Sequence, residues 1–165
     1  PTSERFERLE ESLKLAKALC SGDETSFAGK HFSAPAITNN PRPLSSPHPR
    51  IMIGGTGPNK TLRMVAQYAD ACNIGDWVGA ENMQNALDTL KHHCETLGRD
   101  YDSIEKTSLC TVQLSGKDTV GSVISRIKEL SAMGFTHVIF NMPDVYTITP
   151  LKAFAQEIIP SVAGL

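Results

Sequence analysis

The stretch IMIGGTGPNKTLRMVAQYADA, residues 51–71, decides how this chain folds. Its first three residues are apolar and run into two glycines, after which apolar side chains recur at helical spacing, at Leu62, Val65, Ala66 and Ala69. A short apolar run, a glycine turn and an amphipathic stretch are typical of a β-strand that leads into an α-helix. A second short apolar run follows at once, so the helix is predicted to return the chain to a second, parallel strand.

The same strand-then-helix unit recurs through the rest of the chain. Strands are predicted at four places: Ile51–Ile53, Ala71–Ile74, Thr107–Leu114 and His137–Phe140. Four such units over 51–165, the last with a helix that begins at Thr149-Pro150, predict an α/β fold in which helices cover a parallel sheet. Two architectures fit this pattern: half of a (β/α)8 TIM barrel, or a small open doubly wound parallel sheet. A complete barrel needs about 250 residues, and the chain has 165.

The residues before the first strand are organised differently. Residues 1–22 are predicted to form a leading helix, which Ser3 caps and Gly22 ends. Prolines crowd the second half of 23–50, and proline is excluded from the interiors of helices and sheets. We therefore predict an extended connection over 23–50 that lies on the surface of the domain.

Composition indicates one ordinary globular domain over 1–165. The formal net charge of −2 gives no general attraction for nucleic acid or for an anionic membrane. The sequence has no apolar run of about 18 residues and no secretory signal, so we expect a cytoplasmic protein. Its four cysteines form no C-x-x-C pair and lie in apolar stretches. We expect them to be small buried hydrophobic residues, with neither a disulfide framework nor a metal site.

The loop Gly54–Asn59 is the most specific candidate for ligand binding, because ligands of parallel α/β folds bind at the carboxyl ends of the strands. Gly54 and Gly55 would let a ligand approach the backbone. The N–H groups of Thr56, Gly57, Asn59 and Lys60 would meet it at the positive end of a helix dipole, which suits a phosphate. The loop matches neither G-x-G-x-x-G nor a Walker A sequence, and the residues by themselves slightly favour a purely structural corner over a phosphate site.

Other candidates carry weaker signals. Asn73 ends a buried strand and is a candidate ligand-binding residue, whereas Asn141 and Trp77 lie in other loops at the same edge. Asp70 lies at the opposite end of its strand, which favours a cap or an ion pair. We find no Ser-His-Asp arrangement, no paired carboxylates in one loop and no evident nucleophile, so no catalytic residue is assigned.

Four segments resemble the C-terminal half of luciferase-like flavin and deazaflavin oxidoreductases, and most closely the deazaflavin-dependent branch. They are RFERLEESLKLAKAL (5–19), SFAGKHFSAPAITNNPRPL (26–44), PHPRIMIGGTGPNKTLRMVAQYADACNIG (47–75) and LGRDYDSIEKTS (97–108). The resemblance implies the C-terminal half of a (β/α)8 barrel, whose strands five to eight are the four predicted strands. It also implies that the cofactor phosphate lies near the loop after strand five, at Gly54, Gly55, Thr56 and Gly57.

The resemblance implies an oxidoreductase that moves a hydride between the deazaflavin coenzyme F-420 (F420) and a small organic substrate. A flavin mononucleotide (FMN) monooxygenase is the alternative, and a non-catalytic, dimerising or phospho-ligand-binding half-barrel is the third reading. Strands one to four have no counterpart in this sequence, so we expect the chain to be inactive by itself. Its open sheet edges predict self-association, with a dimer as the simplest form.

Overall fold

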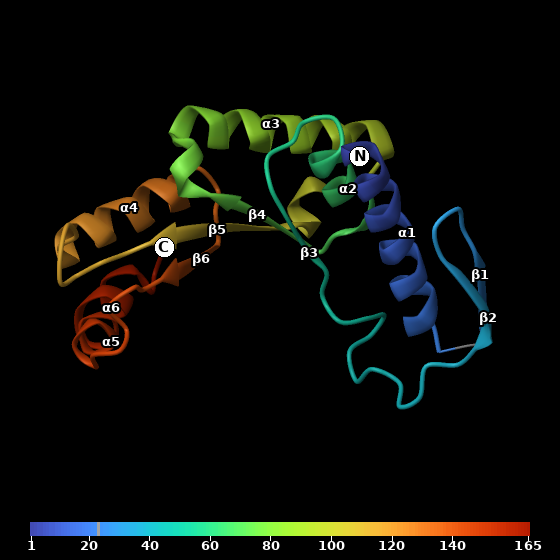
Figure 1. The fold of residues 1–165 in the computed structure, drawn as a ribbon. Helices are drawn as coiled ribbons and strands as arrows, with labels where there is room; N and C mark the ends of the chain where they lie inside the picture. The colour runs from blue at the N-terminus through green and yellow to red at the C-terminus, as the bar shows by residue number, and fades with distance from the viewer. Residues whose placement is uncertain (23) are drawn as a thin grey trace.

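The four predicted strands form one parallel sheet in the computed structural model, which describes residues 1–22 and 24–165. The strands are β3 (Met52–Gly54), β4 (Ala71–Gly75), β5 (Glu105–Thr111) and β6 (His137–Asn141). They lie side by side in chain order, β3-β4-β5-β6 (Figure 1). A doubly wound sheet reverses its strand order at a switch point, whereas a (β/α)8 barrel adds each strand beside the last. The order therefore matches an arc of a barrel.

Helices follow each strand, as the apolar spacing predicts. Three of them lie along one face of the sheet (Figure 1): α2 (Thr61–Tyr68), α3 (Ala80–Leu97) and α4 (Val120–Ala132). Among residues 1–22 and 24–165, no helix is long and apolar enough to cross a membrane.

The last predicted helix is broken into three parts beside β6. They are α5 (Thr149–Ala153), a π-helical turn η3 (Phe154–Ile158) and α6 (Ile159–Val162). Pro160 has no N–H with which to bond the carbonyl of Gln156, so a regular α-helix cannot continue through this point.

The core lies between the sheet and these helices. Leu62, Ile74 and Leu90 are fully buried there, on α2, β4 and α3. Three of the four cysteines, Cys72, Cys94 and Cys110, are also buried as predicted, whereas Cys20 is half-buried. On the opposite, inner face of the sheet, the Met52 side chain of the edge strand β3 is 46% exposed, whereas Thr107 on β5 is fully buried.

Strand β5 differs in its bounds from the prediction of Thr107–Leu114. It begins at Glu105, whose N–H donates to the carbonyl of Asp70 at 2.9 Å. It ends at Thr111, shortly before the N–H of Gln113 turns to the Asp118 carboxylate at 2.7 Å. Hydrogen bonds to residues of other segments therefore set both ends of the strand.

The prediction of an extended connection without strands over 23–50 was wrong. Residues Thr25–Ala28 (β1) and Ser33–Ile37 (β2) form an antiparallel hairpin, although β2 contains Pro35. Within the described residues β2 pairs with β1 on one edge only, and an edge strand tolerates a residue that lacks an N–H. Asp23, which the prediction included, lies outside the described residues.

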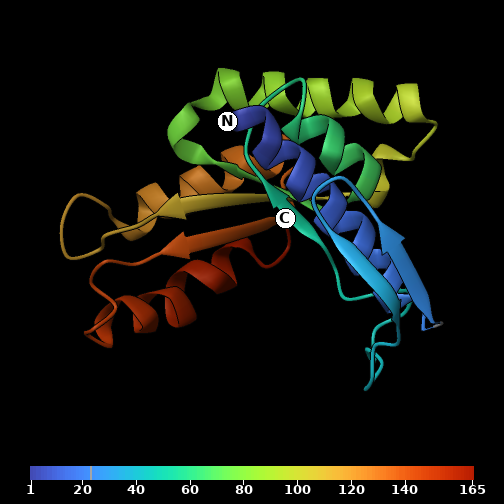
Figure 2. The same cartoon turned by 45° about the vertical axis from the view of Figure 1, so that its right-hand side comes forward.

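The hairpin is held by α1 (Thr2–Cys20), the leading helix, whose N-cap is Pro1 and not the predicted Ser3. The Glu11 carboxylate accepts hydrogen bonds from the backbone N–H groups of Lys30, His31 and Phe32 at 2.8–2.9 Å. Glu7 pairs with the Lys30 ammonium at 2.7 Å and with His31 Nε2 at 2.8 Å. Figure 2 shows the hairpin alongside the helix that supplies both carboxylates.

We expect this hairpin contact to weaken in acid. Hydrogen bonds from Lys30 and then His31 lower the pKa of Glu7 from 4.5 to about 2. Desolvation raises the pKa of Glu11, but the three backbone donors outweigh it and the net shift is also downward. A depressed carboxylate pKa stabilises the fold above the unfolded value, and this stabilisation is lost as pH falls from about 4.5 towards about 2. Glu11→Gln should lower the unfolding midpoint at pH 6.5, and its difference from the wild type should shrink as pH falls below 4.5, because the pKa of Glu11 is also lowered; a difference that stays constant through this fall in pH would contradict this.

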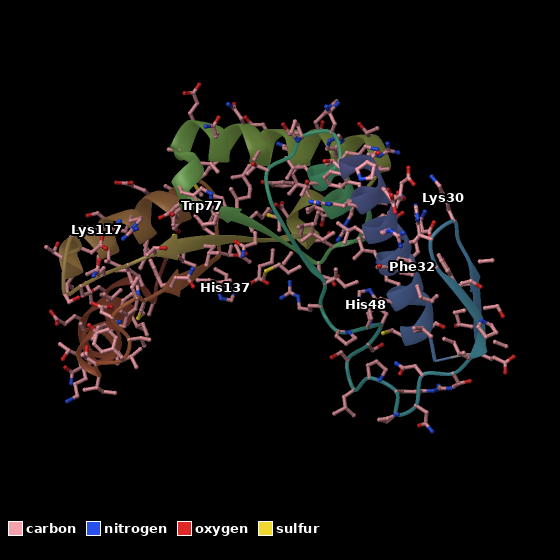
Figure 3. The ribbon with its side chains drawn as sticks, viewed as in Figure 1. Lys30, Phe32, His48, Trp77, Lys117 and His137 are labelled. Atoms are coloured by element: carbon pink, nitrogen blue, oxygen red, sulfur yellow. The ribbon has the colours of Figure 1, made fainter. Side chains whose placement is uncertain are left out.

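The amino ends of the strands carry a second set of ion pairs, opposite the predicted ligand edge. The Asp70 carboxylate accepts the N–H of Ile51 at 2.7 Å, which confirms its structural role. Glu105 bonds Arg50 at 2.8 Å and His137 at 3.3 Å. Figure 3 shows His48 well away from Trp77, which follows β4 at its carboxyl end. The amino end of a barrel sheet contributes to stability, and we assign these residues no ligand.

Candidate functional site

The loop after β3 turns sharply away from the sheet at Gly55. Gly55 has a φ of +119°, which side chains rarely allow, and its N–H donates to the carbonyl of Asn73 at 2.9 Å. Gly54 pairs with Asn73 across the β3–β4 ladder. The structure therefore brings together the predicted glycine pair and Asn73, from segments about twenty residues apart.

Several backbone donors of this loop have no partner inside the protein. Among residues 1–22 and 24–165, no hydrogen bond uses the N–H groups of Thr56, Gly57, Asn59 or Lys60. The loop ends in a turn, because α2 begins at Thr61 with Lys60 as its N-cap. Pro58 therefore precedes the helix. The free N–H groups remain close to the positive end of the α2 dipole.

Thr61, the first residue of α2, lies against this loop and was not among the predicted site residues. A Cβ on Gly57 would lie 2.9 Å from Thr61 Oγ1, and a Cβ on Gly55 would lie 3.3 Å from its Cγ2. Because Gly55 and Gly57 have no side chains, the Thr61 side chain can pack directly against the loop backbone. The Thr61 hydroxyl therefore lies beside the loop that carries the free N–H groups. The sequence signal that could have identified Thr61 is a hydroxyl-bearing residue at the start of the helix that follows the loop.

Asn73 carries an unsatisfied polar atom at this edge. Its side-chain Oδ1 is buried and has no hydrogen-bond partner within the described residues. A Cβ on Gly54 would lie 3.9 Å from the Cβ of Asn73, so the bare glycine leaves the space beside this side chain open. A buried acceptor without a donor is costly, and a ligand that brings a hydroxyl or an N–H would satisfy it.

The predicted site residues do not all face one hollow. Thr56 lines a hollow of about 320 Å³ with two asparagines of α3, Asn82 and Asn85. Asn59 instead lines a separate hollow between α1 and α2, where Lys60 and Arg63 lie near Glu7 and Glu10. The side chain of Asn59 is therefore separated from the hollow of Thr56, and the basic residues face the carboxylates of α1.

The loop after β4 is fixed by a clamp centred on Arg126 of α4. The guanidinium bonds Asp76 at 3.2 Å, Asp118 at 3.1 Å and the carbonyl of Thr111 at 3.1 Å. These partners come from the ends of β4 and β5 and from the loop after β5. The clamp joins the loop after β4 to the loop after β5, and no sequence motif predicts it.

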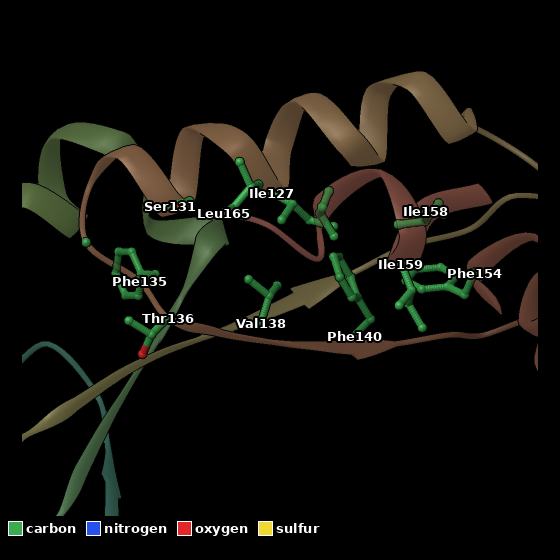
Figure 4. A pocket seen from close by; sticks show the side chains of 12 residues that line it. Ile127, Ser131, Phe135, Thr136, Val138, Phe140, Phe154, Ile158, Ile159 and Leu165 are labelled. Carbon is green, nitrogen blue, oxygen red and sulfur yellow. The ribbon is translucent and has the colours of Figure 1, made fainter. Parts of the chain in front are cut away.

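Two further hollows have a different character. One of about 500 Å³ lies between the loops after β5 and β6, where Ser115, Thr147 and Thr149 supply hydroxyls among apolar residues. The other, of about 450 Å³, lies between α4, β6 and the C-terminal turns and is lined mainly by apolar side chains such as Phe135, Phe140 and Phe154 (Figure 4). Val138 and Phe140 belong to the helix-facing side of β6, so this hollow lies on the outside of the sheet and away from the ligand edge.

The buried thiols are not suited to nucleophilic chemistry. Burial raises the pKa of Cys110 to about 11, and burial also raises the pKa of Cys72 and of Cys94. A thiol is a good nucleophile only as the thiolate. The carboxyl edge therefore offers binding groups, namely N–H donors, hydroxyls and an amide, and no activated nucleophile among these cysteines.

The sequence is similar to one family model and to several curated proteins. The family model for luciferase-like monooxygenases matches residues 1–133. An uncharacterized protein of Mycobacterium tuberculosis is 27% identical over 173 residues, which cover 98% of this chain and 55% of that protein. The FMNH(2)-dependent dimethylsulfone monooxygenase of Pseudomonas putida is 38% identical over 74 residues, which cover 45% of this chain and 18% of that protein. The chain thus spans about half the length of the curated relative that it matches throughout.

Solved structures share the fold. The coenzyme F420 dependent tetrahydromethanopterin reductase of Methanopyrus kandleri has a TM-score of 0.77 at 14% identity, covering 94% of this chain and 63% of that chain. A riboflavin lyase solved with modified FMN and riboflavin has a TM-score of 0.78 at 10% identity, covering 98% of this chain and 57% of that chain. Such identities show the fold, an α/β arrangement that corresponds to a part of luciferase-like TIM-barrel enzymes.

Proposed function

This chain belongs to the luciferase-like monooxygenase family, and from that premise we propose that it binds a flavin-type cofactor through the loop Gly54–Gly57. The observation that carries the proposal is the buried, unpartnered Oδ1 of Asn73 beside a loop of free N–H groups. The N–H groups of Thr56 and Gly57 hold the cofactor phosphate, and the Thr61 hydroxyl adds a further donor. The Oδ1 of Asn73 accepts a hydrogen bond from a hydroxyl of the cofactor chain.

Two cofactors suit these groups, because FMN and coenzyme F420 both carry a phosphate on a hydroxylated chain. We propose the deazaflavin first, with hydride transfer to or from a small organic substrate, because the segments at 5–19, 26–44, 47–75 and 97–108 resemble that branch most closely. The FMN monooxygenase alternative is favoured by the 38% identity to the FMNH(2)-dependent enzyme. In either case the bound cofactor supplies the redox chemistry, while this chain binds and orients it.

The described residues supply the phosphate end of the site, and the rest of the active site is proposed to lie in the barrel strands that have counterparts only in the longer relatives. The chain covers 55–63% of the relatives and solved structures that it matches throughout. The exposure of Met52 on the inner face and the free edges of β3 and β6 agree with this division. Self-association of this chain through those edges stays a prediction.

Gly55→Val is expected to abolish cofactor binding. A β-branched residue at a φ of +119° is strained, and its side chain would displace Thr61 from the loop. Thermal unfolding of the wild-type chain should shift upward with saturating FMN or F420, and the shift should vanish in the variant. Gly98→Val is the matched control, because Gly98 also has a positive φ but lies at the C-cap of α3, outside the loop Gly54–Gly57. It should lose stability and still respond to the cofactor; no shift in the wild type with either cofactor would overturn the proposal.

A further inference from the structure

We propose that Trp77 forms an aromatic wall at the carboxyl end of β4, against which the planar ring of the bound cofactor packs. The inference rests on the proposed function and deepens it, because the loop Gly54–Gly57 accounts only for the phosphate. Trp77 is the sole tryptophan of the chain, and 70% of it is exposed. Figure 3 places it at the carboxyl edge of the sheet.

The indole lies directly over the last residue of β4. A Cβ on Gly75 would lie 2.3–2.4 Å from three carbons of the benzo ring, so the ring occupies the place where a side chain would begin. Successive residues of a strand point to opposite faces, and Gly75 shares a face with Ala71 and Asn73. The indole therefore lies on the inner face of the sheet at Gly75. Asn73, whose side-chain Oδ1 has no hydrogen-bond partner within the described residues, lies on the same face two residues earlier in the strand.

The loop that carries the indole is held in place from the other side. Asp76, the neighbour of Trp77, bonds Arg126, and the same guanidinium bonds Asp118. The short 3₁₀ turn η1 (Asp76–Val78) then ends at Gly79, which has a φ of +83° and is the N-cap of α3. One side of the indole thus rests on Gly75 and its backbone is anchored, while its other side is open to solvent.

These features indicate a planar, uncharged aromatic partner. The charged residue next to Trp77 in the chain, Asp76, is paired with Arg126. An indole face favours offset stacking or edge contact with another aromatic ring. The indole rests on Gly75 with 70% of the residue exposed, so it presents an open aromatic face at the carboxyl edge of the sheet. The fused ring of a flavin or deazaflavin has the required shape, and its phosphate would extend towards the loop after β3.

The test separates the ring from the phosphate by using riboflavin, which has the ring without a phosphate, and ribose 5-phosphate, which has a phosphate without the ring. Calorimetric titration should show that Trp77→Ala weakens riboflavin binding roughly tenfold and Trp77→Phe much less, while ribose 5-phosphate binding is unchanged in both. Gly75→Ala keeps the tryptophan but places a methyl group where the indole lies, and it should weaken riboflavin binding as Trp77→Ala does. Leu97→Ala, at an exposed apolar residue on α3, should change neither ligand.

Fluorescence adds a readout of direct contact. Riboflavin emission should be quenched on the wild-type chain, because an indole in contact quenches excited flavin, and it should stay bright when bound to Trp77→Phe. Equal riboflavin affinity in the wild type and Trp77→Ala, or no riboflavin binding to the wild type, would overturn this inference. If ribose 5-phosphate still binds and Gly55→Val removes that binding, the proposed phosphate site stands while the aromatic wall fails. If neither ligand binds the wild type, both proposals fail.

Discussion

Replacing Leu62 with alanine should lower the free energy of unfolding by about 2–5 kcal/mol, the usual cost of removing a fully buried leucine from a core. Leu62 has no exposed surface and belongs to the core cluster in which α2 meets β3 and β4. It also follows Thr61 directly, so the cavity would form beneath the candidate phosphate loop. Urea unfolding followed by circular dichroism measures the change.

The control for this prediction is Leu97→Ala, which removes the same atoms from a residue that is 44% exposed. It should cost well under half as much, because less apolar surface is taken from water at that position. An equal loss in the two variants would contradict the assignment of the core to the space between the sheet and the helices.

Arg126→Ala should also destabilise the chain strongly and should loosen the loop after β4. The arginine side chain is 24% exposed, and its removal leaves Asp76 and Asp118, at 22% and 12% exposure, without their shared cation. Breaking a fully buried pair costs about 3–5 kcal/mol; partial exposure reduces the expected loss here to roughly 2–3 kcal/mol. Hydrogen exchange should show faster opening of residues 76–79 as well as a lower unfolding midpoint.

Two matched variants test the clamp itself. Lys128→Ala removes an exposed cation from the same helix and should change stability by less than about 0.5 kcal/mol. Arg126→Lys keeps the charge but cannot bond three partners with a planar fork, so it should recover only part of the loss. If Arg126→Ala unfolds at the same urea concentration as the wild type, the clamp does not hold the two loops.

The regular part of the fold follows from local pattern. The strand-glycine-helix unit at 51–71 and its repeats predicted all four parallel strands, because apolar spacing differs between strand and helix. The hairpin at 25–37 was missed because Pro35 argues against a strand unless that strand is known to be an edge. Its anchor, Glu11, lies about twenty residues earlier on a helix, and a single sequence does not pair a carboxylate with distant N–H groups.

The candidate site was predictable in part for the same reason. Gly54, Gly55 and Asn73 come together because parallel strands end at one edge, which sequence order already implies. The direction of the Asn59 side chain depends on the backbone just before α2, and in the structure it lines the hollow beside α1. The Arg126 clamp joins three segments, so it depends on tertiary packing that no local motif records.

The central claim is that the N–H groups of the loop after β3 hold a cofactor phosphate. Amide resonances observed in an ¹H–¹⁵N NMR titration test it most directly, with FMN compared against riboflavin. We predict that FMN shifts the amide signals of Thr56 and Gly57 and the side-chain amide of Asn73, while riboflavin leaves Thr56 and Gly57 unmoved. Unmoved Thr56 and Gly57 signals at saturating FMN, or equal shifts with riboflavin, would contradict the claim.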